Sequence, residues 1–168
     1  MNRAFTTVLL VSAAALSACK KEPPASLPPE PEPTVTSTPN TGSTAPVPGT
    51  QEHFVQGVNG QNVIYFDTDR YNIDSADAAA LQTQAQYLSR YPQVNITIEG
   101  HADERGTREY NLALGERRAN AAKNYLVGLG IAAGRINVVS YGKERPVALG
   151  SNEAAWAQNR RAVSVVIN

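Results

Sequence analysis

The chain has 168 residues, of which 42% are hydrophobic, and this is enough for one folded domain with a modest core. Fifteen basic and fifteen acidic residues give a formal net charge of +0, so the composition does not indicate a nucleic-acid-binding protein. The single cysteine excludes an internal disulfide, and no stretch is both apolar and long enough to span a bilayer as a permanent helix.

An apolar segment near the start resembles the signal peptide of a bacterial lipoprotein. Arg3 is a positive residue ahead of it, and residues 4–16 are apolar or small. Small residues then precede Cys19, with Leu16 three positions before the cysteine. This order resembles the lipobox, in which the thiol receives lipid and the chain is cut before it. We therefore predict a lipoprotein signal peptide over 1–18. The alternative is an ordinary signal peptide with an incidental thiol.

The next segment is predicted to be an anchor and a tether. Acyl chains such as palmitate on Cys19 would anchor the chain durably, because each buried methylene adds about 0.8 kcal/mol. Lys20 favours the outer membrane of a Gram-negative bacterium, since Asp at that position is the usual inner-membrane retention signal. Nine of the eleven prolines fall between Pro23 and Pro48, where large apolar residues are scarce. Residues 19–55 are therefore predicted to form a lipidated, disordered tether.

The remaining segment, residues 56–168, alternates strand and helix patterns. Alternating or β-prone runs predict strands, and apolar residues at three- and four-residue steps predict helices. The predicted order is a strand over 62–66, a helix over 75–90, a strand over 93–99, a helix over 108–129, a strand over 137–141, a short helix over 153–158 and a strand over 161–167. Asp74 or Ser75, Thr107 and Asn152 are the expected N-caps. This order predicts an α+β fold, a four-stranded mixed sheet with helices on one face.

The two charged residues that best suggest a binding site lie in the stretch 98–119. An apolar alternating strand ends at Gly100, and Asp103 follows on a charged loop. Arg118 lies on the next helix, so a carboxylate and a guanidinium sit on neighbouring rigid elements. Such a pair can grip a ligand that carries both an ammonium and a carboxylate. Taken alone, however, residues of these types are more often a solvated loop carboxylate and a surface ion-pair partner.

Other kinds of chemistry lack the residues they need. His101 suggests a metal site with its acidic neighbours, but no second histidine has the helical spacing, and His53 lies in the predicted tether. Cys19 is assigned to lipid, and no nucleophile elbow, phosphate-binding loop or dinucleotide fingerprint is present. We predict no metal, no cofactor and no enzyme, and His101 is expected to hydrogen-bond its loop neighbours. Arg160 and Arg161 fit either a local basic patch or the solvated start of a strand.

Several long blocks of the domain resemble one family. They are IEGHADERGT at 98–107, LGERRANA at 114–121, VSYGKERP at 139–146 and NRRA at 159–162. In this order they resemble the OmpA-like peptidoglycan-binding domain, most closely the version found in lipid-anchored members of the family. The resemblance covers roughly residues 60–168 and implies the βαβαβ(α)β sandwich of that family.

The resemblance also implies a ligand and a site. In that family the domain binds the diaminopimelate residue of the peptidoglycan stem peptide. Carried over by motif, Asp103 would receive the ammonium of the ligand and Arg118 would pair with its carboxylate. Asp69 and Thr68 would line the pocket through main-chain contacts, and Leu114 would pack on the methylenes. Arg suits this role because its planar fork binds a carboxylate through two hydrogen bonds.

Two residues depart from the family pattern. Thr68 stands where the family often has a second Phe, so one apolar wall of the pocket is altered. Arg108 stands where Pro often follows the Gly-Thr turn. Proline is favoured at the first helical position but is not required there, so the fold is expected to be unaffected.

The first function that we consider is a binding and structural one. The resemblance implies an outer-membrane lipoprotein, facing the periplasm, that links the membrane to the wall and exchanges with the propeller protein TolB of the Tol system in envelope integrity and cell division. The first alternative is an OmpA-like wall-binding lipoprotein without a TolB interaction. The second is a wall-processing enzyme, for which the sequence provides no convincing nucleophile, metal or carboxylate pair.

Overall fold

The structure is a computed structural model that describes residues 46–167. The predicted signal peptide, the lipid attachment site Cys19 and the tether up to residue 45 lie outside these residues. Within the part of the chain that is described, no helix is long and apolar enough to cross a membrane.

The described chain forms helices and strands that follow the predicted order. The helices are α1 (Gln51–Gly57), α2 (Ser75–Arg90), α3 (Arg108–Gly128) and α4 (Glu153–Asn159), with a 3-10 helix at Ala133–Arg135. The strands are β1 (Val63–Tyr65), β2 (Asn95–His101), β3 (Ile136–Gly142) and β4 (Arg161–Ile167). The predicted caps are confirmed at Asp74, Thr107 and Asn152, whose side chains accept backbone N–H groups in the first helical turn.

The folded domain begins earlier than predicted, at helix α1. The sequence placed residues 51–55 in the tether, but Thr50 caps a helix there by accepting the backbone N–H of His53. The Phe54 side chain of this helix is fully buried, and its ring packs edge-on against Tyr87 of α2. Because Phe54 belongs to the hydrophobic core, the predicted domain boundary at residue 56 is too late.

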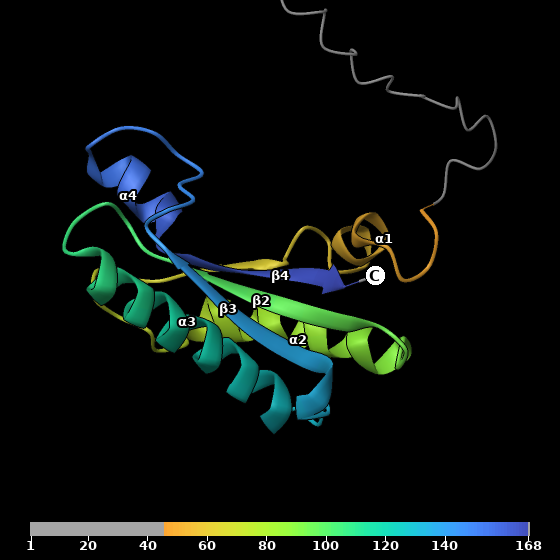
Figure 1. Cartoon of the computed structure of the whole chain (residues 1–168). Coiled ribbons are helices and arrows are strands. Elements are labelled where there is room, and N and C mark those ends of the chain that lie inside the picture. The colour runs from red at the N-terminus through yellow and green to blue at the C-terminus, as the bar shows by residue number, and fades with distance from the viewer. Residues whose placement is uncertain (1–45, 168) are drawn as a thin grey trace, which may run out of the picture. The chain divides into compact units, whose positions relative to one another are not determined.

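The four strands form one mixed sheet in the order β1-β4-β2-β3. Strand β4 is antiparallel to both of its neighbours, while β2 and β3 are parallel and are joined by α3. Figure 1 shows α2 and α3 beneath the sheet and α4 beyond one end of the strands. The predicted α+β fold, a four-stranded mixed sheet with its two long helices on one face, is confirmed. The core between them contains Leu81, Leu88, Ile96, Ile98, Leu126 and Ile136.

Helix α3 packs unusually close to the sheet. Gly100 of β2 and Gly115 of α3 face each other, and a Cβ atom added to Gly100 would collide with the carbonyl group of Gly115. A Cβ atom on Gly115 would in turn collide with the Ser140 hydroxyl, which donates to the Leu112 carbonyl at 2.7 Å. The absence of a side chain at both glycines therefore allows the close approach. The approach fixes where α3 side chains lie relative to the end of β2.

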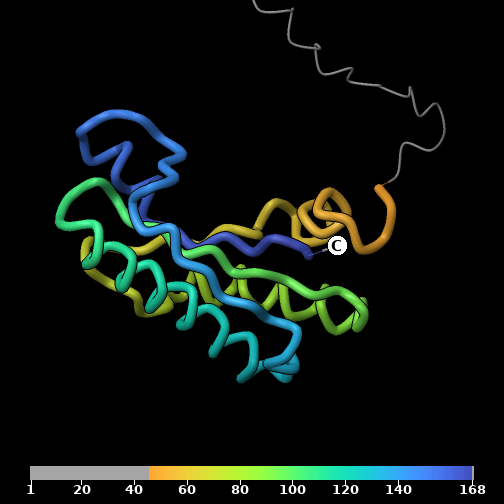
Figure 2. The backbone as a smooth tube through the Cα atoms, in the orientation of Figure 1, coloured from red at the N-terminus to blue at the C-terminus, as the bar shows by residue number. Residues whose placement is uncertain are grey.

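Three connections meet at one end of the domain. Figure 2 traces the β1–α2 turn, the β2–α3 loop and the segment that leads to α4 to this same end. Side-chain hydrogen bonds tie them together, from Arg105 of the loop to Thr68 of the turn at 3.3 Å, and from Trp156 of α4 to Glu104 at 3.0 Å. The residues that the sequence proposed as a site lie here.

Candidate functional site

Arg118 lies beneath the site and holds its parts together. The residue is fully buried on α3, and its guanidinium donates to three main-chain carbonyls. Nη1 reaches His101 at 2.8 Å, while Nε and Nη2 reach Arg70 and Asp67 of the β1–α2 turn at 2.9 and 3.0 Å. Burial lowers the pKa of Arg118 to about 10, so the group remains charged at neutral pH. Arg118 therefore ties the turn to the end of β2.

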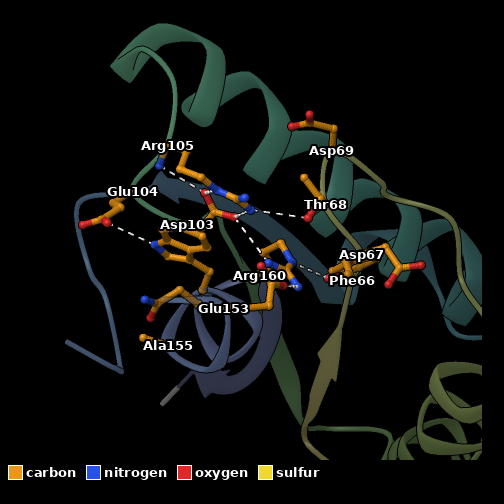
Figure 3. Close-up of polar contacts among 12 residues, drawn as sticks. Phe66, Asp67, Thr68, Asp69, Asp103, Glu104, Arg105, Glu153, Ala155 and Arg160 are labelled. Atoms are coloured by element: carbon orange, nitrogen blue, oxygen red, sulfur yellow. Dashed lines mark hydrogen bonds and ion pairs between the residues drawn. The ribbon is translucent and has the colours of Figure 1, made fainter. Parts of the chain in front are cut away.

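Asp103 lies at the mouth and is paired with Arg105. The Nη2 atom of Arg105 is 2.6 Å from Oδ2 of Asp103, and its Nε donates to Oδ1 at 3.1 Å (Figure 3). The backbone N–H of Arg105 also donates to Oδ1, at 3.1 Å. Burial would raise the pKa of Asp103, but these hydrogen bonds outweigh it and lower the pKa below its ordinary value. Asp103 is thus a charged carboxylate at neutral pH.

A second guanidinium approaches Asp103 from the other side. Nη1 of Arg160 is 3.5 Å from Oδ2 of Asp103, and a dashed line in Figure 3 marks this ion pair. The same side chain donates to the Phe66 carbonyl at 2.9 Å and to Glu153 of α4 at 2.8 Å. Only 8% of the Arg160 side chain is exposed, and Arg161 is buried as well. Both interpretations of these two arginines, as a local basic patch and as the solvated start of a strand, are therefore wrong.

The β1–α2 turn supplies the opposite wall. Thr68 accepts a hydrogen bond from Nη2 of Arg105, which the Phe common in the family at this position could not do. Asp69 has a φ of 54°, a left-handed conformation that Asp tolerates better than most residues. Its carboxylate accepts the Tyr110 hydroxyl of α3 at 3.3 Å. A pocket of about 380 Å³ opens beside the turn and is lined by Asp69, Arg70, Tyr71 and Asn72.

The predicted residues thus fall into two layers. Asp103, Thr68 and Asp69 lie around the mouth, and Figure 3 shows them on neighbouring segments. Leu114, which is only 3% exposed, and Arg118 lie on the buried side of α3. Among the described residues, Arg118 forms no hydrogen bond with Asp103. All five residues lie at one end of the domain, but Asp103 and Arg118 have different hydrogen-bond partners.

Sequence reasoning did not identify Arg105 as the cation that pairs with Asp103. Arg105 stands two residues after Asp103, and no periodic pattern indicates which way a loop side chain points. Trp156 of α4 lies under the Arg105 guanidinium, whose carbon is 4.2 Å from the ring centroid. Tertiary contacts between residues far apart in sequence bring these groups together. The charged loop after β2 was therefore the only sequence signal for this part of the site.

His101 does not behave as expected either. The ring is 2% exposed and stacks on Tyr141, with 5.6 Å between ring centroids. Neither ring nitrogen has a hydrogen-bond partner among the described residues, so the predicted bonds to loop neighbours are absent there. Burial, with Arg161 and Arg145 nearby, lowers the pKa of His101 to about 4, which leaves the ring neutral at neutral pH. No cluster of three potential metal-ligating side chains occurs within residues 46–167.

Comparison with known proteins agrees with this architecture. A sequence profile of the OmpA family matches residues 65–160. The peptidoglycan-associated lipoprotein of Rhizobium meliloti is 54% identical over 125 residues, which cover 74% of this chain and 70% of that protein. The crystal structure of the peptidoglycan-associated lipoprotein of Burkholderia pseudomallei has a TM-score of 0.64 at 48% identity, covering 68% of this chain and 99% of that one.

The chain belongs to the OmpA family, within its group of peptidoglycan-associated lipoproteins. The peptidoglycan-associated lipoprotein of Haemophilus influenzae is 50% identical over 102 residues, which cover 61% of this chain and 67% of that protein. The segment that matches the OmpA family begins at the last residue of β1 and ends at Arg160. It therefore includes every residue of the candidate site, from the β1–α2 turn to the second guanidinium on Asp103.

Proposed function

We propose that this chain binds peptidoglycan non-covalently, through the diaminopimelate of the stem peptide. The observation that carries the proposal is the charged carboxylate of Asp103 at the mouth of a site held on rigid elements. Its partner Arg105 is 39% exposed on the side chain, so a cation from outside can compete for the same carboxylate. Family membership supports the wall as the source of that cation, since the relatives are named for their association with peptidoglycan.

Each predicted residue has a place in this proposal. The ammonium at the free end of diaminopimelate binds Asp103, while main-chain groups of Thr68 and Asp69 line the opposite wall. Arg118 fixes that wall through its three carbonyl bonds and adds positive charge beneath the site. Two of its five N–H groups remain for a ligand carboxylate that reaches it. Leu114 supports the aliphatic part of the ligand from below.

Binding to the wall is tested with purified sacculi. Asp103→Asn keeps the shape of the side chain and removes its charge, and the loss of one partner from a partly desolvated charge pair costs about 2–5 kcal/mol. Co-sedimentation of the purified chain with sacculi should therefore weaken by at least tenfold. Glu109→Gln is the matched control, because it removes an exposed carboxylate from the first turn of α3. Equal losses in both variants would indicate a diffuse electrostatic surface and would contradict the site.

The same assay distinguishes a binder from a wall-processing enzyme. A binder sediments with sacculi and leaves them intact, whereas a hydrolase releases soluble fragments during the incubation. We infer that the chain is a binder, because the site consists of ion pairs and backbone bonds and its relatives are named for wall association. Soluble muropeptides that appear with the wild-type chain and not with buffer would contradict this.

We also propose that the chain is a lipoprotein of the outer membrane and part of the Tol-Pal system. The lipobox at Cys19 and the following Lys20 support the anchor and its membrane. The proposed TolB partner rests on the resemblance alone. Cys19→Ser should abolish lipid attachment, because a hydroxyl does not replace the thiol as acceptor. If this variant still fractionates with the outer membrane after wall-bound protein has been removed, the anchor is wrong.

A further inference from the structure

A second pocket lies between the start of α2 and the end of α4. It has a volume of about 340 Å³ and is lined by the end of β1, the first turn of α2 and the last turn of α4. Among the described residues that line it, none is Asp103, Arg105 or Arg118. Figure 3 shows the carboxylate of Asp67, which does line it, pointing away from Asp103. The pocket is therefore a neighbour of the candidate site and not a part of it.

The walls of this pocket carry an excess of negative charge. Three carboxylates line it, those of Asp67, Asp74 and Asp77. Within residues 46–167, none of the three forms an ion pair with a basic residue. Arg160 also lines the pocket, but its guanidinium is paired with two carboxylates outside it. The one arginine of the pocket therefore leaves these three charges without a cation of their own.

The carboxylate of Asp77 has one oxygen without a partner. Oδ1 accepts the backbone N–H of Tyr65 at 3.1 Å, and the backbone N–H of Asp77 donates to the N-cap Asp74 at 2.8 Å. Asp77 is only 7% exposed, and its Oδ2 has no hydrogen-bond donor among the described residues. Leaving a buried carboxylate oxygen unpaired is costly, so its place in the wall of a pocket favours a donor that comes from outside.

The neighbouring charges favour a positively charged donor. Burial raises the pKa of Asp77, and the carboxylates of Asp74 and Asp67 raise it as well, while the hydrogen bond from Tyr65 opposes them. A cation in the pocket would stabilise the charged form of Asp77 and reduce the repulsion among the three carboxylates. Because Oδ2 is shielded from solvent, little water would weaken its attraction to that cation.

We infer that this pocket binds an organic cation, an alkyl chain that ends in a primary ammonium group. An ammonium has three N–H donors and can therefore bond to more than one carboxylate at once. The three carboxylates do not form a metal-ligand cluster, since no group of side chains within residues 46–167 does so. The methylenes of the chain would pack on Tyr65 and Ala157, which also line the pocket.

Two sources can supply such a group, a free diamine and the lysine side chain of a peptide, and the chemistry of recognition is the same for both. The inference does not depend on the proposed function. None of the residues assigned to the wall ligand, Asp103, Arg118, Asp69, Thr68 and Leu114, is among the described residues that line the pocket.

The test is a titration of the purified chain, followed through backbone signals in a nitrogen–proton correlation spectrum. The probes are cadaverine, Nα-acetyl-lysine amide, pentanol as an uncharged chain, and magnesium chloride at the same ionic strength. Asp77→Asn removes the charge and keeps an oxygen that can accept from Tyr65. Glu52→Gln is the matched control, because it removes an exposed carboxylate from the first turn of another helix, α1.

Cadaverine should shift, in a saturable way, the signals of residues around the pocket, such as Tyr65, Asn72 and Gln158. Pentanol and magnesium should not. In Asp77→Asn the affinity should fall roughly tenfold to a hundredfold, because a hydrogen bond to a charged group is lost, and in Glu52→Gln it should stay unchanged. Lysine amide that binds at least as tightly as cadaverine assigns the pocket to a peptide side chain, and weaker binding assigns it to a free diamine.

The inference is overturned if cadaverine gives no saturable shift, if magnesium gives the same shift, or if Asp77→Asn binds cadaverine as the wild type does. A saturating amount of the diaminopimelate tripeptide should leave the cadaverine affinity unchanged. If the tripeptide displaces cadaverine, the pocket belongs to the candidate site and the inference is also wrong. Asp77→Asn should bind sacculi as the wild type does, so this inference and the proposed function can fail separately.

Discussion

Two arginines of this domain, only 13 positions apart in the sequence, occupy opposite kinds of environment. Arg118 is buried under the β1–α2 turn, and its partners are carbonyls of the backbone. Arg105 lies at the mouth of the site, and its partners are side chains that can move. The same guanidinium group therefore holds backbone segments together in one place and pairs with side chains at the mouth of the site in the other.

The difference shows how a site can be both rigid and exchangeable. Backbone carbonyls cannot leave Arg118 without moving the turn or the end of β2, so this cation fixes the wall of the site. The Asp103–Arg105 contact joins two side chains at the mouth of the site, so it can break without moving the turn or the end of β2. Substitutions in the buried layer should therefore reduce stability, and substitutions at the mouth should reduce binding.

The largest expected effect is on stability, in Arg118→Ala. The change removes three hydrogen bonds and leaves three carbonyls without their donor, at about 1–3 kcal/mol for each buried group that stays unpaired. We expect the free energy of unfolding in urea to fall by about 3 kcal/mol or more. Arg117→Ala, at the exposed neighbouring position, should change it by less than about 0.5 kcal/mol. If both variants unfold at the wild-type urea concentration, the structural role of Arg118 is wrong.

The next effect concerns pH and His101. Burial lowers its folded pKa to about 4, below the unfolded value of about 6.5, so the unfolded chain binds the proton more readily. Stability that is fully present above pH 6.5 should be lost as the pH falls toward 4, by about 3 kcal/mol in total. Asp103 contributes in a lower pH range. Its folded pKa is lowered, so the stability that it contributes is lost only as the pH falls below the ordinary pKa of an aspartate.

Urea titrations at a series of pH values test this assignment. In His101→Phe the ring no longer titrates, while the carbonyl that accepts from Arg118 remains. The stability of this variant should depend less on pH between 6.5 and 4 than that of the wild type. Wild-type and variant curves that run parallel through this range would show that His101 does not carry the effect.

A smaller effect is expected where α3 approaches the sheet. Gly100→Ala places a Cβ atom against the Gly115 carbonyl, and overpacking of this kind costs about 1–3 kcal/mol. Because α3 carries both Leu114 and Arg118, a displaced helix should also weaken sacculus binding. Gly128→Ala is the control, since a Cβ atom there meets no neighbour within 4 Å. Urea unfolding of the two variants checks the difference, and equal stabilities would mean that the close approach is not needed.

The smallest effect on stability should come from Arg105→Ala, in contrast to Arg118→Ala. Its ion pair is partly exposed to solvent, and such pairs contribute about 1 kcal/mol or less. The urea midpoint should therefore stay close to that of the wild type even if ligand binding is lost. A loss as large as that of Arg118→Ala would remove the distinction between the two layers.

Local patterns predicted most of the fold. The caps of α2, α3 and α4 depend on single polar residues that precede each helix, so Asp74, Thr107 and Asn152 were identified directly. Helix α1 was missed because it is short, follows the proline-rich segment, and is held by Phe54, whose core contacts are distant in sequence. Strand β2 continues to His101, past its predicted end, because pairing with β3 continues past Gly100 with a shift in register.

The site was less predictable, since its decisive contacts are long-range. The blocks around Asp103 and Arg118 marked the correct end of the domain. The partners of Arg118 lie up to 51 positions away in sequence, so no pattern around Arg118 indicated that carbonyls would occupy it. The contact of Arg105 with Thr68 also joins segments 37 positions apart. Residue types can be assigned from motifs, but their partners depend on how the three connections fold together.

One measurement tests most directly whether Arg105 and Arg118 have different roles in the site. The side-chain Nε–H groups of arginine give separate signals in a nitrogen–proton correlation spectrum, recorded on the purified chain during titration with the diaminopimelate tripeptide. The proposed function predicts that the signal of Arg105 shifts progressively as the ligand ammonium competes with its guanidinium for Asp103. The signal of Arg118, bound to the Arg70 carbonyl at 2.9 Å, should stay close to its position in the free chain. A large shift of the Arg118 signal, with Arg105 unchanged, would contradict the account.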